Sequence, residues 1–175
     1  KPLTSLGTPM MAGITPVPII CDAIHHVDLL RWLAGSTLET AADPTHVYAE
    51  SWQGERPGSF RYNASIVFGN GCKGIMMNHY GVGFRIQRAE AHAEDFSAYL
   101  DLTGGVPECE LYADGAPCDE PLDLDAVGGP EFNETRHFVT CIREDKTPWS
   151  NLEDLVVTMK LSEAIAEEVK GEIDV

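Results

Sequence analysis

The sequence predicts an α+β fold with an open, mostly antiparallel sheet of about five to six strands and helices packed on one face. Segments in the middle of the chain alternate apolar and polar residues, which is the pattern of half-buried strands. Segments near both ends have apolar residues at helical spacing instead. Short turns join the strand segments, and neighbouring strands joined in this way run antiparallel.

Composition is that of an ordinary globular protein. The 175 residues are enough for one core, and no apolar run approaches the ~20 residues that cross a bilayer. The formal net charge of -16 would repel phosphate backbones and anionic lipids, so we expect no nucleic-acid and no membrane partner. Five cysteines without a Cys-x-x-Cys pair indicate reduced thiols in a cytoplasmic protein. We expect an extended lead-in over 1–18 and a single domain over 19–175.

The first helix is expected over 22–34, where Ile24, Val27 and Leu30 recur at helical spacing. Asp22 is placed to cap the start of this helix through its carboxylate. Gly35 is placed to end it in a left-handed conformation.

The same helix has a stripe of acid, imidazole and acid, formed by Asp22, His25 and Asp28. Buried charges must be paired, so the stripe either faces a cleft, where it can move protons, or is satisfied inside the core. Cys21, Asp22, His25 and His26 are possible metal ligands. Adjacent histidines point about 100° apart on a helix, however, which disfavours a metal site.

Period-two alternation and turn residues predict the strands. A strand is expected over 45–52, with a short one before it near 38–41, and further strands over 60–68, 84–92, 96–102 and 109–112. Gly69 to Gly74 has the letters of a G-x-G-x-x-G nucleotide fingerprint, but no helix follows it. Asn70-Gly71 is a strong signal for a two-residue hairpin, so we expect a hairpin there and a turn at Asp114-Gly115.

Two helices are expected to close the chain. Gly129-Pro130 should start the first, which ends near residue 145 ahead of Pro148. Ser150-Asn151-Leu152-Glu153 has the capping-box pattern, and the last helix is expected to run from there to Gly171. The inner stripe of the first of these helices is expected to comprise Phe132, Thr135, Phe138, Val139, Cys141 and Ile142.

This order of elements resembles the C-terminal domain of the Gfo/Idh/MocA family of NAD(P)-dependent oxidoreductases, over nearly all of 19–171. The residues that carry the resemblance are His25-x-x-Asp28-Leu29-Leu30-Arg31-Trp32-Leu33-x-Gly35, Ile66-Val67-Phe68-Gly69-Asn70-Gly71, and Phe138, Pro148, Ser150, Glu153 and Asp154.

The resemblance implies the substrate-binding and oligomerisation domain of a dehydrogenase for a sugar, inositol or related polyol. It implies NAD or NADP as cofactor, held by a separate Rossmann domain. We expect that domain to be absent from this chain, which has no βαβ unit, and expect the chain alone to bind no cofactor and to be inactive. A homodimer or homotetramer through the open sheet face is also implied.

His25 matches the catalytic histidine of the family, because Asp28 to Trp32 fixes the register; His26 would match only under a one-residue shift. Many relatives have an Asp four residues earlier, where this chain has Cys21, with Asp22 next. Asp22 is therefore a candidate catalytic partner, but the partner carboxylate stays open. A hydride leaves a carbinol carbon as its hydroxyl loses a proton, which a histidine can take.

Five residues are candidates for substrate binding: His26, His79, Tyr80, Arg85 and Arg88. Arginine and tyrosine near a strand end suit a polyhydroxylated or carboxylated ligand. Surface strand residues without a role are the alternative for the last four. The competing function is a stand-alone, sheet-mediated oligomerisation or small-ligand-binding module without catalysis.

Overall fold

The computed structural model describes residues 17–35, 37, 40–56, 58–104, 106, 108–118 and 133–175. The chain divides into two compact units, one of Lys1–Gly81 with Phe138–Val175 and one of Val82–His137. The α+β class with open antiparallel sheets is confirmed, and the strands are divided between two four-stranded sheets. The expected lead-in lies outside the described residues up to residue 16.

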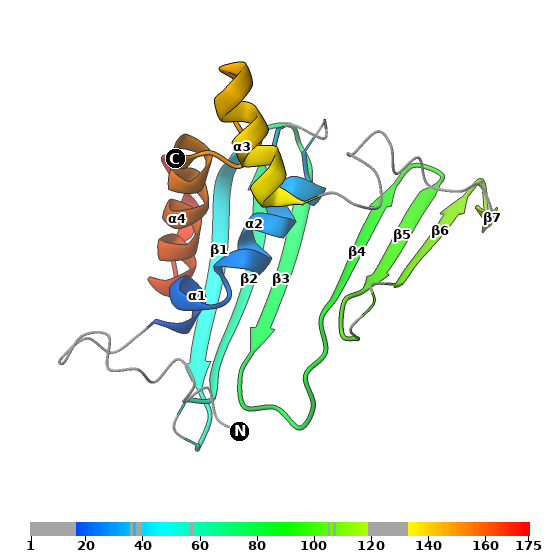
Figure 1. Cartoon of the computed structure of the whole chain (residues 1–175). Coiled ribbons are helices and arrows are strands. Elements are labelled where there is room, and N and C mark those ends of the chain that lie inside the picture. Colours follow the sequence, from blue (N-terminus) through cyan, green and yellow to red (C-terminus); the bar gives the residue numbers. More distant parts are fainter. Residues whose placement is uncertain are drawn as a thin grey trace. The chain divides into compact units, whose positions relative to one another are not determined.

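The sheet of the first unit has the strand order β3-β2-β1-β8, and every neighbouring pair is antiparallel. Figure 1 shows β1, β2 and β3 side by side in this sheet. Its strands are β1 (Pro44–Gln53), β2 (Phe60–Phe68), β3 (Lys73–His79) and β8 (Lys170–Glu172). The strands predicted over 45–52 and 60–68 are confirmed. Strand β8 was not predicted, because Lys-Gly-Glu contains no apolar residue to alternate with polar ones.

The turn between β2 and β3 confirms the predicted hairpin. Val67 is directly opposite Lys73, and Gly71 between them has a φ of 88°, which glycine adopts without strain. A Cβ added to Gly74 would lie 3.1 Å from the side chain of Leu30, so this glycine lets the strand approach a helix closely. Gly69 to Gly74 is therefore a strand turn with packing glycines.

The helix predicted over 22–34 corresponds to α2 (Ile24–Leu33), and a short helix that was not predicted, α1 (Pro18–Cys21), precedes it. The prediction that Asp22 caps α2 was wrong. Asp22 follows the last residue of α1, and Ala23 occupies the cap position of α2 without a side-chain hydrogen bond. Gly35 is not in the predicted left-handed conformation. An added Cβ at Gly35 would collide with the carbonyl oxygen of Thr40, so a close backbone approach requires glycine there.

The core lies between one face of this sheet and the helices α1, α2 and α4 (Leu152–Ala166). Met76 and Met77 point to opposite sides, as predicted: Met76 is 7% exposed and Met77 is 72% exposed. We call the face that these helices do not cover the open face. It carries Tyr48, Glu50, Trp52, Arg61, Asn63, Ser65, Ile75, Met77 and His79. The core includes Ile19, Val27, Val47, Ala49, Tyr62, Ala64, Ile66, Phe68, Met76, Leu161 and Ile165.

The ends of the two closing helices differ from the prediction. Asn151 rather than Ser150 caps α4, because its side chain accepts a hydrogen bond from the backbone of Asp154. This helix ends at Ala166, before the unpredicted β8. The helix α3 is described over Glu134–Glu144, and its predicted start at 129–132 lies outside the described residues.

The apolar stripe predicted to be buried on α3 is largely exposed. Phe138 is 54% and Ile142 is 65% exposed, and among the described residues of the helix only Cys141 is buried. Helical spacing predicts that a helix is amphipathic, but not which element covers its apolar side.

The sheet of the second unit has the order β4-β5-β6-β7, again antiparallel throughout. Its strands are β4 (Arg88–Ala93), β5 (Phe96–Asp101), β6 (Glu108–Ala113) and β7 (Ala116–Pro117). The strand predicted over 84–92 begins only at Arg88, and Phe84 and Ile86 are exposed in a loop. The turn at Asp114-Gly115 is confirmed. Near 38–41, Thr37 and Thr40 form an isolated bridge, and residues 38 and 39 lie outside the described residues.

Candidate active site

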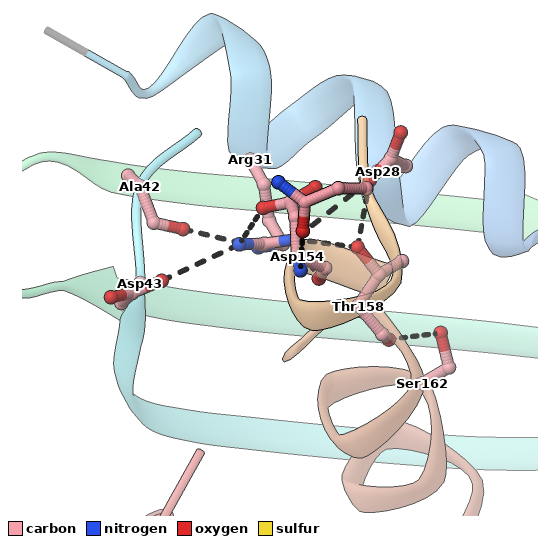
Figure 2. A network of polar contacts seen from close by, with 8 residues as sticks. Asp28, Arg31, Ala42, Asp43, Asp154, Thr158 and Ser162 are labelled. Carbon is pink, nitrogen blue, oxygen red and sulfur yellow. Dashed lines mark hydrogen bonds and ion pairs between the residues drawn. The ribbon is translucent and has the colours of Figure 1, made fainter. Parts of the chain in front are cut away.

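Arg31 is fully buried on α2 and joins α2, α4 and the segment before β1 (Figure 2). Its Nε donates to the carbonyl of Ala42 at 3.2 Å, and Nη1 donates to the hydroxyl of Thr158 at 2.6 Å. Nη2 donates to Oδ1 of Asp154 at 2.9 Å. The hydroxyl of Thr158 in turn donates to Oδ1 of Asp28 at 2.7 Å. We call Asp28, Arg31, Asp154 and Thr158 the Arg31 clamp.

The electrostatics of the Arg31 clamp indicate a structural role. Carboxylates lie 2.9, 3.4 and 3.8 Å from the guanidinium, those of Asp154, Asp43 and Asp28 respectively. One buried cation thus faces three acids, which leaves it no free donor capacity for a substrate. Burying a charge is unfavourable unless it is paired and hydrogen-bonded, as Arg31 is here. Asp28 and Arg31, which share a helix with His25, therefore hold α2 in place against α4 and the segment before β1.

The junction of α1 and α2 is fixed by a contact with the end of β3. The hydroxyl of Tyr80 donates to Oδ2 of Asp22 at 2.9 Å and is 3.3 Å from the carbonyl of Pro18. Burial, followed by the hydrogen bond to the Asp22 carboxylate, raises the pKa of Tyr80 well above its ordinary value. Tyr80 therefore keeps its proton and orients Asp22. The structure brings together two predicted site residues here.

His25 lies in the first turn of α2 with its side chain exposed, and His26 beside it is half-buried. His25 forms no hydrogen bond with another described residue. Asp28, which the helix spacing had placed near His25, accepts the hydrogen bond from Thr158 instead. An imidazole that is exposed on a fixed helix can exchange a proton with a ligand that approaches from outside this chain.

His79 and Tyr80, although adjacent in sequence, serve opposite sides of the sheet. His79 is on the open face, where its Nε2 lies 2.9 Å from Oδ1 of Asn63 and its ring is 5.4 Å from that of Trp52. Tyr80 packs against the core and reaches Asp22. Side chains alternate along a strand, so the structure does not bring His79 to the Asp22–Tyr80 contact.

Arg85 and Arg88 belong to the second unit and form local contacts there. Arg85 donates to the side chain of Gln87 at 2.9 Å, and Nε of Arg88 donates to Oδ2 of Asp101 at 2.9 Å. Hydrogen bonds from Thr103, together with the one from Arg88, lower the pKa of Asp101 to about 2. Both arginines are exposed, and these contacts do not test the prediction that they bind substrate.

Sequence reasoning missed Thr158, Asn63 and Trp52 as polar or aromatic partners. No local pattern pointed to Thr158, which meets Arg31 across 127 positions of sequence. Asn63 and Trp52 could have been found from strand pairing, because both lie near His79 on neighbouring strands.

The residues that the structure describes contain neither a metal-binding cluster nor a membrane-spanning helix. These residues contain no group of three or more His, Cys, Asp or Glu placed to hold a metal ion, and Cys21, Asp22, His25 and His26 are not gathered into one. No described helix is long and apolar enough to cross a bilayer.

No protein-family model matches the sequence, and no curated protein matches it. Among solved structures, the chain is similar to the aldose-aldose oxidoreductase of Caulobacter crescentus complexed with glycerol, with a TM-score of 0.66 and 18% identity. That match covers 83% of this chain and 43% of the other. It is also similar to the UDP-N-acetylglucosamine 3-dehydrogenase of Acidithiobacillus ferrooxidans, with a TM-score of 0.63 and 16% identity.

The second match covers 90% of this chain and 50% of the dehydrogenase, so the chain spans half or less of the length of each neighbour. At 16% to 18% sequence identity, the similarity to these two structures is a similarity of fold alone. The predicted resemblance to the C-terminal domain of the Gfo/Idh/MocA oxidoreductases is therefore confirmed at the level of the fold.

Proposed function

We propose that this chain is the substrate-binding and oligomerisation domain of an NAD(P)-dependent Gfo/Idh/MocA oxidoreductase acting on a sugar, inositol or related polyol. One observation carries the proposal: His25 is exposed in the first turn of α2, next to the junction that Tyr80 fixes through Asp22. Two sugar oxidoreductases share the fold in which this histidine lies.

Nucleotide binding would belong to a further domain. The described residues offer a dinucleotide no glycine-rich turn at the start of a helix, because Gly69 to Gly74 lies between two strands. This chain would instead contribute the floor on which the substrate lies, with His26 and Tyr80 as binding candidates beside His25.

The proposed chemistry couples loss of a hydride from a carbinol carbon to loss of the proton from its hydroxyl, leaving a carbonyl. The nicotinamide cofactor, when bound, supplies the hydride acceptor. His25 takes the hydroxyl proton at an imidazole nitrogen. Tyr80 is unsuited to the role of base, because burial and the Asp22 carboxylate keep it protonated. Asp22, held by Tyr80, is the candidate carboxylate partner in this proposal.

The open face would provide the oligomer interface. Tyr48, Trp52, Ile75 and Met77 are 42% to 77% exposed on it, and monomers rarely expose such a contiguous apolar surface. Around a shallow hollow in this face lie Tyr48, Glu50, Asn63, Ser65, Ile75, Met77 and Lys170.

The distribution of charge also supports the open face as the oligomer interface. The chain has a formal net charge of -16, so most of its surface repels a second copy. Its open face carries Glu50 and Glu172 but also Arg61, Lys73 and Lys170, and is therefore close to neutral. Two open faces can pack against each other in a symmetric dimer, or in a tetramer of such dimers.

A substrate screen on the full-length protein tests the proposal. We expect reduction of NAD or NADP with at least one aldose, inositol or nucleotide sugar in a panel of polyols. Matched primary alcohols without further hydroxyl groups should not support turnover. Binding of a sugar without turnover with either nucleotide would favour the alternative, a ligand-binding module without catalysis.

A further inference from the structure

The helix α4 has apolar side chains on two opposite sides. Its inner side includes Leu161 and Ile165, which are fully buried in the core between the helices and the sheet. Residues three and four positions apart lie on one side of a helix, and four apolar residues at this spacing lie opposite the inner side. We call these four residues the outer stripe: Leu152, Leu155, Val156 and Met159.

Most of the outer stripe is exposed to solvent. Leu152 is 76%, Leu155 is 41% and Val156 is 52% exposed. A helix at the surface of a protein usually has polar residues on its outer side, whereas a helix that is apolar on all sides is usually buried between two layers. Among the residues that the structure describes, α4 has a covering layer on its inner side only. The outer stripe therefore has the composition of a buried surface but lacks the layer that would bury it.

The helix α3 presents a second apolar stripe in the same unit. Phe138 and Ile142 are about one helical turn apart, and they are 54% and 65% exposed. The chain from Phe138 onward belongs to the first unit, as does α4, and only residues 145–151 separate the two helices. Exposed apolar stripes on two consecutive helices of such an acidic chain indicate a surface that another part of the protein covers.

We propose that the outer stripe, together with Phe138 and Ile142, docks a further domain of the full-length protein, joined to this chain through the segment before Val17. Val17 occupies the cap position of α1, and α1 packs against α4 (Figure 1). A domain joined there is tethered beside the helix whose outer side is uncovered. The proposed function makes this the nucleotide-binding domain, so the identity of the domain rests on that function, whereas its docking does not.

A tethered domain fits this surface better than a second copy of the chain does. The chain covers only 43% and 50% of the two solved structures with this fold, so each of them is long enough for a further domain. A tether keeps such a domain at a high effective concentration, and a small interface then suffices. An interface between separate chains has about 20–30 residues a side, many more than the outer stripe offers. The open face is the larger surface for a second copy.

The test is hydroxyl-radical labelling, read residue by residue with mass spectrometry, in the full-length protein and in this chain alone at equal molar concentrations. We expect the labelling rates of Leu152 and Phe138 to be at least fivefold lower in the full-length protein, because the docked domain covers both side chains. Ile86 is the reference, since it is 60% exposed in a loop of the second unit and should change less than twofold. Equal rates for Leu152 in the two proteins would overturn the proposal.

Val156→Glu and Ile86→Glu form a matched pair, because both introduce a charge at a similarly exposed apolar residue. In the full-length protein, Val156→Glu should return the labelling rate of Leu152 to within twofold of its value in this chain alone, since an unpaired charge is unfavourable in a buried contact. Ile86→Glu should leave the rate low. No recovery in Val156→Glu, or equal recovery in both variants, would contradict the docking. If Val156→Glu lowers the urea midpoint of this chain alone, Val156→Ser replaces it and should raise the rate at least twofold.

A second copy is the other possible cover of the outer stripe. It would protect Leu152 in this chain alone as the concentration rises, and Val156→Glu would then lower the mass measured by light scattering; this result overturns the proposal. Turnover by a full-length protein whose Leu152 is unprotected would overturn the docking and leave the proposed function standing. Protection of Leu152 in the full-length protein without binding of NAD or NADP would support the docking and contradict the proposed function.

Discussion

Oδ2 of Asp22 accepts a 2.9 Å hydrogen bond from the hydroxyl of Tyr80, which joins the end of β3 to the break between α1 and α2. The two residues of the break, Asp22 and Ala23, come directly before the first turn of α2, in which His25 lies. The position of this histidine therefore depends on a contact between segments that are 58 positions apart in sequence.

Tyr80→Phe should destabilise the chain, because it removes the donor and leaves the half-buried Asp22 carboxylate without it. Hydrogen bonds to charged groups contribute about 1.5–3 kcal/mol. We expect a loss of this order in the free energy of unfolding, measured with urea at pH 7. Tyr48→Phe is the control, since Tyr48 is 51% exposed on the open face, and it should change little. Similar losses in both variants would contradict the role of the contact.

The Tyr80 contact should also weaken at high pH. Burial and the hydrogen bond to Asp22 raise the pKa of Tyr80 in the folded state above its ordinary value of 10.0. The stability that comes from the neutral phenol is thus fully present below pH 10 and is lost as the pH rises above it. The difference in free energy of unfolding between wild type and Tyr80→Phe should narrow between pH 9 and pH 11. A constant difference over this range would show that the phenol does not titrate in this way.

Arg31→Met should be among the most destabilising single substitutions in the chain. It leaves Asp154 partly buried without its cation, and breaking a buried ion pair on one side costs about 3–5 kcal/mol. Urea unfolding followed by circular dichroism measures this loss. Arg143→Met is the control: Arg143 is exposed on α3, and its substitution also removes one positive charge but breaks no buried ion pair. It should change the free energy of unfolding by less than about 0.5 kcal/mol.

The chain should assemble through its open face. Light scattering at low micromolar concentration should give at least twice the 19.1 kDa mass of one chain. Met77→Glu adds a charge in the middle of this face and should produce monomers, whereas Leu152→Glu, at an equally exposed position on α4, should not. A wild-type mass of 19.1 kDa would rule out the interface.

This chain should bind neither NAD nor NADP by itself. Gly69 to Gly74 forms a turn between β2 and β3, and backbone N–H groups at the start of a helix, which bind pyrophosphate, are not available there. Calorimetric titration with each nucleotide should show no heat of binding. Micromolar affinity for either one would contradict the assignment of the nucleotide site to another domain.

Local periodicity was enough to predict β1, β2 and the hairpin at Asn70-Gly71, because the alternation of apolar and polar residues and the preference of Asn-Gly for tight turns depend only on residues adjacent in sequence. It failed where distant segments decide the structure. Asp22 does not cap a helix because Tyr80 engages it, and Asp28 lies in the Arg31 clamp because Thr158 meets it from α4. The three-residue β8 forms only because the edge of β1 is available to pair with it.

The central claim is that His25 exchanges the proton of the substrate hydroxyl, and a comparison of His25→Ala with His26→Ala in the full-length protein tests it most directly. Both residues lie in the first turn of α2, so the two variants disturb the same helix. His25→Ala should lower kcat by the ~10²–10⁴-fold typical of a missing general base. His26→Ala should retain most of the turnover. Equal losses, or a larger loss in His26→Ala, would contradict the assignment of His25.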